Sequence, residues 1–413
     1  MNKVIIVGGG AAGMLAGIIA ARNGCQVVLY EKNEKLGKKI FITGKGRCNV
    51  TNNCDPEELL QAVKSNNKFL YSAFYSFNSQ DMMALLEESG VPLKTERGNR
   101  VFPVSDHSSD IIRGLERLLH RYDVHIRLRK EVQEILVEDG RAAGIRLKDG
   151  YEDRAQAVVV ATGGLSYPTT GSTGDGYRFA RETGHTVTDC MPSLVPLTVS
   201  EDYIGEMAGL SLRNVELTIR NGKKILYQDF GEMMFTHKGI TGPLVLSASS
   251  SIGKQLKKQG TLEGYIDLKP ALSSEQLDER ILREFENAKN KQFKNVIGVL
   301  FPSSLTPVII RLGGIPEDKV IHEISREERL NFVSIIKAFP FTIDGLGGYS
   351  EAVITKGGIS VKEINPGTME SKKIPRLYFA GEVLDLDAVT GGYNLQIAWS
   401  TGYLAGMAVS ENI

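Results

Sequence analysis

The sequence has few cysteines, and their spacing limits the chemistry available to them. Only four occur in 413 residues, and no two form a C-x-x-C pair: Cys25, Cys48, Cys54 and Cys190. Scattered cysteines of this kind are typical of reduced thiols, because disulfide frameworks and zinc sites need paired spacing. We therefore expect neither a disulfide nor a metal site.

The sequence also lacks a net charge and a long apolar run. Lys plus Arg and Asp plus Glu both number 49, so no global charge commits the protein to nucleic acid or to an anionic membrane. No apolar run approaches the length that spans a bilayer, and a core strand begins within the first few residues, which leaves no room for a signal peptide. We expect a cytoplasmic protein of two or three domains with no membrane contact.

Glycine, in contrast, is abundant at 44 residues and concentrated in a few motifs. The first motif, GGGAAG at 8–13, follows an apolar strand and precedes a helix of small residues. In a dinucleotide-binding unit, Gly8 permits the tight turn, Gly10 lets a pyrophosphate approach, and Gly13 lets the helix pack on the strand. The next strand ends at Glu31, which can accept hydrogen bonds from a ribose 2′-hydroxyl. An acid at this position favours FAD or NAD over NADP.

A loop at 32–53 is rich in glycine, lysine and asparagine and has little to bury. Such a loop is either mobile or held by a ligand. Its basic side chains could face phosphates or could be solvated: Lys38, Lys39, Lys45 and Arg47. The dense run GKGRCN at 44–49 indicates backbone that approaches another group closely.

Two later glycine motifs also follow apolar strands. The segment AVVVATGG at 157–164 is typical of a buried parallel strand whose carboxyl end opens a ligand crevice. Further along, a strand at 377–380 is closed by Gly381 and Glu382, and GGYN at 391–394 begins a helix of small and apolar residues. The amino terminus of that helix would lie near a ligand, unless the glycine pair is only a helix-entry turn.

From about residue 190 the pattern changes. Alternating apolar and polar residues predict an antiparallel β region, and helical periodicity follows it. We therefore predict an α/β fold class, with a discontinuous Rossmann-like domain of residues 1–190 and 341–413. An inserted substrate or cap domain of residues 191–340 would have a barrel-like antiparallel β part, about 191–270, and a helical part, about 271–340.

With these motifs the chain resembles a known family, the bacterial two-dinucleotide-binding-fold flavoproteins of the BaiN/RdsA (YhiN-like) type, which are NAD(P)/FAD-dependent oxidoreductases. The similarity covers essentially the whole length and rests on GGGAAG, GKGRCNVTN, ATGG with SYPTTGSTGDG, FTHKGITGP and FAGEVLDLDAVTGGYNLQIAWSTG. The first and third marks are shared with other flavoproteins, and the others are characteristic of the family. Lys45 and Ala388 depart from the family pattern, because glycine often stands at both positions.

The resemblance implies an extended FAD in the Rossmann-like domain. The first glycine loop would take the pyrophosphate and Glu31 the adenosine ribose, with Val132 near the adenine. Glu382 or Asp385 would meet the ribityl hydroxyls, and the N–H groups of 393–395 would face the pyrimidine end of the flavin. The predicted cofactor-binding residues are Gly8, Gly10, Ala11, Ala12, Gly13, Glu31, Lys32, Lys39, Gly46, Arg47, Cys48, Asn49, Val132, Ala161, Thr162, Gly163, Gly164, Gly381, Glu382, Asp385, Gly392, Tyr393, Asn394 and Leu395.

A bound FAD limits the reaction to hydride or electron transfer. No second G-x-G-x-x-G follows a strand, so NAD(P)H would visit the flavin at the substrate site, or another donor would reduce it. The resemblance favours reduction of an activated C=C bond in a small molecule, with dihydrouridine formation in ribosomal RNA as an alternative. A flavin redox sensor or assembly factor that does not turn over is a third hypothesis. The sequence leaves the oligomeric state open.

Two side chains could donate the proton that a C=C reduction needs. Cys48 lies in the glycine-rich loop, and His237 lies in FTHKGITGP of the inserted domain. Each also has a structural interpretation, as a small buried thiol or as a turn-stabilising imidazole. An RNA substrate would need a basic surface. Basic residues of the inserted domain could form it, although basic runs of this kind are more often solvated helix faces. They are Lys254, Lys257, Lys258, Arg280, Arg283, Lys289, Lys291 and Lys294.

Overall fold

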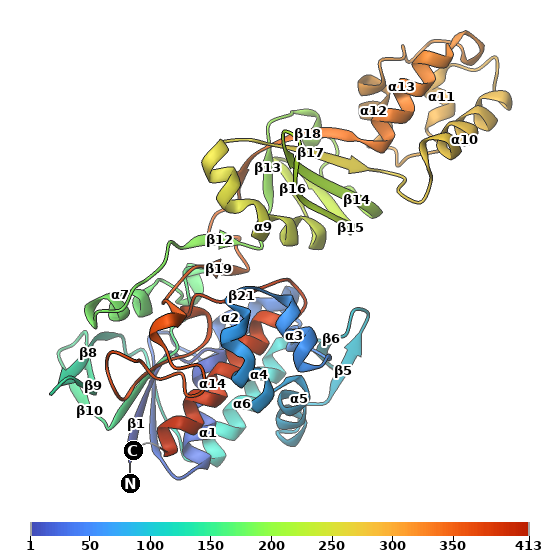
Figure 1. The fold of residues 1–413 in the computed structure, drawn as a ribbon. Helices are drawn as coiled ribbons and strands as arrows, with labels where there is room; N and C mark the ends of the chain where they lie inside the picture. The colour runs from blue at the N-terminus through green and yellow to red at the C-terminus, as the bar shows by residue number, and fades with distance from the viewer. Residues whose placement is uncertain (1, 412–413) are drawn as a thin grey trace. The chain divides into compact units, whose positions relative to one another are not determined.

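The computed structural model describes residues 2–411, which fall into two compact units. Unit 1 comprises Met1–Pro192 and Tyr349–Ile413, and unit 2 comprises Ser193–Gly348 (Figure 1). The expected boundary at residue 340 cuts through strand β18 (Phe339–Leu346), which belongs to the barrel of unit 2. None of the helices within residues 2–411 is long and apolar enough to cross a bilayer.

Unit 1 is built on a five-stranded parallel sheet in the order β20-β11-β1-β2-β7. Its inner strands are buried along nearly their whole length, which explains their unbroken runs of Val, Ile and Leu. The strands are β1 (Lys3–Val7), β2 (Gln26–Glu31), β7 (His125–Leu128), β11 (Ala157–Val160) and β20 (Leu377–Phe379).

The helices α1 (Ala11–Arg22) and α14 (Tyr393–Glu411) pack against each other, as Figure 1 also shows. Small residues permit this close approach. A Cβ on Gly402 would come within 2.5 Å of the Ala12 carbonyl oxygen, and one on Gly406 within 2.7 Å of the Ala16 carbonyl oxygen. The first and last helices of the described chain therefore form one layer beside the sheet.

Further helices and small sheets complete unit 1. Its further helices are α2 (Lys38–Ile42), α3 (Pro56–Ala62), α4 (Tyr71–Ser76), α5 (Ser79–Glu88), α6 (Ser108–Arg121) and α7 (Asp175–Glu182). Small sheets pair β3 (Thr51–Asn52), β6 (Arg100–Pro103) and β5 (Leu93–Glu96), then β21 (Asp387–Ala388) with β4 (Val63–Ser65), and β12 (Met191–Ser193) with β19 (Ile354–Lys356).

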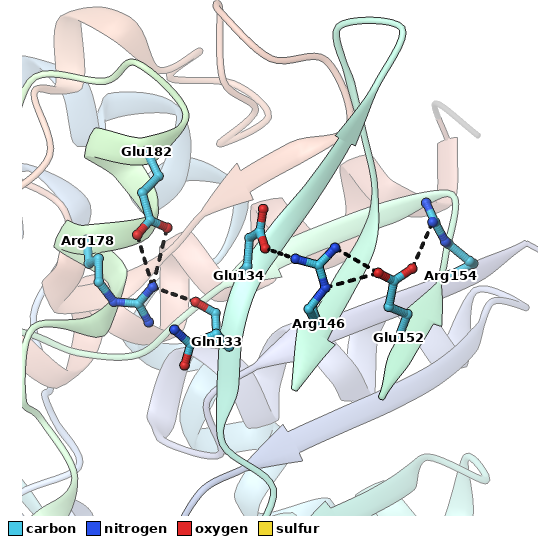
Figure 2. A network of polar contacts seen from close by, with 7 residues as sticks. All are labelled: Gln133, Glu134, Arg146, Glu152, Arg154, Arg178 and Glu182. Carbon is cyan, nitrogen blue, oxygen red and sulfur yellow. Dashed lines mark hydrogen bonds and ion pairs between the residues drawn. The ribbon is translucent and has the colours of Figure 1, made fainter. Parts of the chain in front are cut away.

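A three-stranded antiparallel sheet consists of β10 (Glu152–Arg154), β9 (Arg141–Leu147) and β8 (Val132–Glu138). Figure 2 shows Arg146 of β9 reaching Glu134 on one neighbouring strand and Glu152 on the other. Arg178 of α7 donates a hydrogen bond of 2.5 Å to the Gln133 carbonyl oxygen. These partly exposed ion pairs add little stability. Their consequence is positional, because Arg146 ties β9 to both β8 and β10, and the Arg178 hydrogen bond ties β8 to α7.

Unit 2 contains a closed six-stranded barrel in the order β13-β16-β15-β14-β17-β18. Its strands besides β18 are β13 (Leu197–Val199), β14 (Ser211–Asn221), β15 (Lys224–Thr236), β16 (Gly239–Thr241) and β17 (Leu262–Asp267). The predicted β region therefore exists as a barrel. Two helices accompany it, α8 (Tyr203–Glu206) and α9 (Pro243–Gln259), and the sequence analysis did not predict either of them.

A helical part lies between β17 and β18 along the chain. It consists of α10 (Ser274–Glu286), α11 (Phe293–Ile297), α12 (Thr306–Gly313) and α13 (Arg326–Lys337). Ser273 and Ser325 begin the two longest of these helices with capping boxes. Edge-to-face contacts among Phe285, Phe293 and Phe332 fill the core of this part.

Candidate functional site

An open pocket in unit 1 lies at the carboxyl ends of β1, β2, β11 and β20. Residues at or just after these strand ends line it, namely Val7, Glu31, Ala161 and Ala380. The pocket holds about 1320 Å³ of empty space, including its open mouth. Open parallel sheets bind their ligands at this edge.

The first glycine motif has the geometry that a pyrophosphate needs. Gly8 has φ +108°, and a Cβ there would lie 2.5 Å from the Ala161 carbonyl oxygen. A Cβ on Gly13 would lie 1.9 Å from the Gly8 carbonyl oxygen, so helix and strand meet in direct contact. At Gly10 a Cβ would meet no described atom within 4 Å, and no described side chain caps α1. The amino terminus of α1 is therefore open on the side of the pocket, which Gly10, Ala11 and Ala12 line.

Glu31 is held in place before any ligand binds. Its carboxylate accepts hydrogen bonds from the backbone N–H groups of Gly9 and Asn33, both at 2.8 Å, and from the Asn33 amide at 2.7 Å. Both Glu31 and Asn33 line the pocket. A carboxylate can accept about four hydrogen bonds, so Glu31 keeps capacity for one ribose hydroxyl.

Four lysines line the pocket, and two of them form ion pairs with acids that also line it. Lys32 lies 2.6 Å from Asp175, the first residue of α7. Lys39 lies 2.5 Å from Glu382. The other two are Lys38 and Lys130. Lys32 and Lys39, which the sequence analysis placed at the cofactor, thus both line the pocket.

The ATGG motif contributes Ala161, Thr162 and Gly163 to the lining. The Thr162 hydroxyl is buried and has no hydrogen-bond partner among residues 2–411. Gly164 lies outside the lining, and a Cβ there would come within 2.5 Å of the Thr355 hydroxyl oxygen. Gly164 therefore has a packing role, whereas Ala161, Thr162 and Gly163 line the pocket.

At the carboxy-terminal motif, Gly381, Glu382, Asn394 and Leu395 line the pocket. Asn394 also binds the loop before it, because its side chain accepts from the Ala388 N–H and donates to the Ala388 carbonyl oxygen, both at 2.9 Å. These bonds fix the residues at the start of α14.

Three predicted residues of this motif lie outside the lining: Asp385, Gly392 and Tyr393. The carbonyl oxygen of Asp385 accepts a hydrogen bond of 2.7 Å from the Asn66 amide. Of the two acids considered for the ribityl hydroxyls, the structure brings only Glu382 to the pocket.

The GKGRCN loop is not part of the pocket lining, although the sequence analysis placed Gly46, Arg47, Cys48 and Asn49 at the cofactor. Arg47 instead pairs with Glu96 at 2.5 Å and Asp106 at 2.6 Å, and its guanidinium lies 4.1 Å from the centre of the Phe102 ring. This pairing occupies the Arg47 charge, for which the sequence analysis considered phosphates or solvent as partners.

The Cys48 thiol is fully buried, and burial raises its pKa to about 12. A thiol in this position cannot reach a ligand in the pocket as the structure stands, and its high pKa makes it a weak acid. In the structure Cys48 therefore has the position of a small buried thiol, which is the structural interpretation given above. The side-chain oxygen of the neighbouring Asn49 is buried without a hydrogen-bond partner in the described chain.

Val132, which the sequence analysis placed near the adenine, lies at the start of β8 and lines the pocket together with Lys130 and Glu131. His237 lies in unit 2, in the turn between β15 and β16. Its side chain is exposed. The two residues thus belong to different units.

Within residues 2–411 there is no group of three His, Cys, Asp or Glu side chains that could hold a metal ion.

Several lining residues were not predicted. Val353 and Ile354 lie just before and in β19, and Thr170, Gly171 and Ser172 come from the SYPTTGSTGDG segment. The serine- and glycine-rich composition of that segment was a signal for a ligand site, whereas Val353 and Ile354 lie in an ordinary apolar stretch.

The residues present fit FAD. The uncapped helix start, the cradle at Gly10, the two acids with remaining acceptor capacity and the unpartnered Thr162 hydroxyl are features that a dinucleotide would satisfy. The pocket also extends from the adenosine side at Val132 to the start of α14 at Leu395. It therefore offers polar groups along its length and not at one end alone.

Comparison with known proteins bears on the identity of this site. The family model described as "HI0933-like protein Rossmann domain" matches residues 2–408. The chain belongs to this family. It is 31% identical over 414 residues to the 3-dehydro-bile acid delta(4,6)-reductase of Clostridium scindens, covering 100% of both chains. It is 33% identical over 415 residues to the ribosomal RNA dihydrouridine synthase of Haemophilus influenzae, covering 99% of both.

Among solved structures, the 3-ketosteroid-delta4-(5alpha)-dehydrogenase from Rhodococcus jostii RHA1 is similar, with a TM-score of 0.55 at 16% identity, covering 100% of this chain and 97% of that one. This likeness shows the shared fold. The resemblance drawn from the motifs and the predicted fold class are confirmed. The protein is a flavin-dependent oxidoreductase of the HI0933-like family.

Proposed function

We propose that this protein binds FAD in the pocket of unit 1 and reduces an activated C=C bond of a small molecule. The observation that carries the proposal is the pocket itself, in which the open end of α1, two acids and the start of α14 line one continuous space. The names of the full-length relatives support it, because a delta(4,6)-reductase and a dihydrouridine synthase both saturate a C=C bond.

Different residues of the pocket would bind each part of the FAD. The N–H groups of Gly10–Ala12 would bind the pyrophosphate, Glu31 the adenosine ribose and Glu382 the ribityl hydroxyls. The backbone of Asn394 and Leu395, at the positive end of α14, would stabilise negative charge at the pyrimidine end. Bound FAD supplies a hydride acceptor and donor at flavin N5.

The second carbon of the double bond needs a proton. Cys48 is fully buried and outside the pocket lining, so we do not assign this role to it. We propose His237, an exposed imidazole in the turn between β15 and β16, as the proton donor. A His237→Ala variant that binds FAD and accepts electrons normally but reduces substrate slowly would support this role, whereas unchanged turnover would contradict it.

We propose NAD(P)H as the electron donor, acting directly on the flavin. The sequence has only one strand–GxGxxG–helix unit, which the pyrophosphate of FAD would occupy, so no separate nicotinamide domain is available. The donor would bind transiently where the substrate binds.

An anaerobic absorbance spectrum of the purified protein tests the proposal. A yellow flavin band that NADH or NADPH bleaches, and that an enone then restores, is the expected result. Protein without a flavin band, even after incubation with FAD, would overturn it. A band that neither nucleotide bleaches would favour another electron donor or the redox-sensor hypothesis.

Dihydrouridine formation in ribosomal RNA is the second candidate, because two curated relatives of 33% and 32% identity carry that name. The predicted basic surface gives it limited support, since α10 carries Arg280 and Arg283 among a larger number of acids. Reoxidation of the reduced flavin by uridine-containing RNA but not by enones would favour this candidate. Binding to RNA should then weaken steeply with salt.

A further inference from the structure

Glu382, like Glu31, accepts three hydrogen bonds at the pocket. Its Oε1 accepts hydrogen bonds from the Ser166 hydroxyl at 2.7 Å and from the Thr355 N–H at 2.9 Å. Its Oε2 accepts from Lys39 Nζ at 2.5 Å. The Lys39 ammonium also donates to the Ser166 hydroxyl, so the three side chains form a closed cluster.

The cluster is fixed to the backbone on both sides. The Thr355 hydroxyl accepts from the N–H groups of Leu165 at 2.8 Å and Ser166 at 3.1 Å. Glu382 therefore has one orientation, set by groups that do not depend on a ligand. Three of about four acceptor positions on the carboxylate are used, and Oε2 accepts only from Lys39 among residues 2–411.

The charges of Lys39 and Glu382 matter for the binding of an anionic cofactor. The proposed occupant of the pocket carries a pyrophosphate and, when reduced, a further negative charge on the flavin. An uncompensated carboxylate beside it would repel both. Lys39 and Glu382 both line the pocket, and their side chains are only 22% and 20% exposed, so water screens the pair incompletely.

We propose that Lys39 is a positioning residue that acts through Glu382. Its ammonium neutralises the carboxylate, so that Glu382 can accept a ribityl hydroxyl without repelling the anionic cofactor. Lys39 thereby contributes to the affinity for FAD and raises the reduction potential of the bound flavin. This inference rests on the proposed function, since it requires FAD in the pocket.

The net charge of the pair predicts the order of the variants. The wild type and the double variant Lys39→Met with Glu382→Gln have a neutral pair, Lys39→Met alone leaves one negative charge, and Glu382→Gln alone leaves one positive charge. We expect the reduction potential to be lowest for Lys39→Met, highest for Glu382→Gln, and similar for the wild type and the double variant. Lys39→Met should weaken FAD binding by roughly tenfold or more, and adding Glu382→Gln should restore much of that loss.

The experiment measures the FAD dissociation constant and the midpoint potential of the wild type, the two single variants and the double variant. Lys39→Arg keeps the charge and should remain close to the wild type in both quantities. Urea denaturation of the apo forms shows whether each variant folds, so a folding defect is recognised as such.

Lys32→Met is the matched control, because Lys32 pairs with Asp175 on the adenosine side of the same pocket. It should weaken FAD binding but leave the potential unchanged, and Glu382→Gln should not rescue it. A double variant that binds FAD no better than Lys39→Met, or equal potentials for Lys39→Met and the wild type, would overturn the inference alone. A wild-type protein that binds no FAD would overturn the proposed function as well.

Discussion

Gly392 lies directly against the backbone of Thr51, so that a Cβ on Gly392 would come within 2.4 Å of the Thr51 carbonyl carbon and oxygen. Nearby, Trp399 Nε1 donates a hydrogen bond of 2.9 Å to the Val50 carbonyl oxygen. The GKGRCNVTN and GGYN motifs are therefore packed against each other. The cysteine-containing loop supports the start of α14, which is a structural reason for its unusual composition.

Replacing Gly392 with alanine should destabilise the protein by about 1–3 kcal/mol or more, because φ is +99° and the Cβ would overlap Thr51. Urea denaturation measures the change. Gly298→Ala is the control, since a Cβ there meets no described atom within 4 Å, and its effect should stay within about 0.5 kcal/mol. Equal effects of the two substitutions would contradict the close contact.

Gly10 and Gly13 should respond differently to alanine. Gly10→Ala adds a methyl group in open space at the pyrophosphate position, so the apo protein should remain stable while FAD binding weakens by roughly tenfold or more. Gly13→Ala would place the methyl group 1.9 Å from the Gly8 carbonyl oxygen and should cost about 3 kcal/mol or more of folding free energy. Apo-protein melting and FAD titration separate the two effects. Tight FAD binding by Gly10→Ala would argue against the cradle.

Cys48→Ala should cost about 1–2 kcal/mol of stability and leave turnover intact, because the thiol is a fully buried part of the core. Denaturation and steady-state kinetics of the FAD-loaded variant measure both quantities. A variant that keeps its FAD and stability but loses turnover would restore Cys48 as a proton donor.

The environment of His185 predicts that the folding stability of the protein depends on pH. Burial lowers its pKa, and its ring nitrogens bond Thr183 at 3.0 Å and Ser371 at 2.6 Å. The Ser371 hydroxyl accepts from two backbone N–H groups and so donates to the imidazole, which must be neutral to accept. The unfolded chain therefore binds a proton more readily than the folded one. The contribution of neutral His185 to the free energy of unfolding is complete above the ordinary histidine pKa of about 6.5. It is lost as the pH falls toward the lower pKa that His185 has in the folded protein.

Denaturation midpoints measured across the range in which histidine titrates, roughly pH 8 to 5, test this dependence. His185→Gln should flatten the loss of stability at the acidic end. His120→Gln, on the exposed side of α6, should leave the profile of the wild type unchanged. The same slope in His185→Gln as in the wild type would show that other groups cause the acid sensitivity.

The sequence predicted those parts of the fold that local sequence patterns determine. Unbroken apolar runs indicated β1, β11 and β20, and the glycine spacing indicated the pyrophosphate loop, because one strand–turn–helix unit contains all of the necessary information. Helix α9 was missed, since its run of serines between apolar residues is a weak helical signal.

Long-range contacts explain where the positions of site residues differ from the sequence-based expectation. Arg47 looked available for phosphate, but Glu96 and Asp106, distant in the sequence, pair with it in the fold. Cys48 lies next to partly exposed residues along the chain, yet it is fully buried. Neither outcome follows from local composition, because both depend on contacts with residues distant in the sequence.

Unit 1 is completed only after unit 2 has been synthesised. The segment that supplies Ala380, Gly381 and Glu382, together with α14, follows the inserted unit along the chain. A nascent chain that has just emerged through β18 carries the glycine motif of residues 8–13 but lacks the lining residues that lie after unit 2. Unit 2, which is continuous in sequence, can fold first on the ribosome. If FAD binds as proposed, its insertion must wait until α14 has been synthesised, because residues of α14 line one end of the pocket.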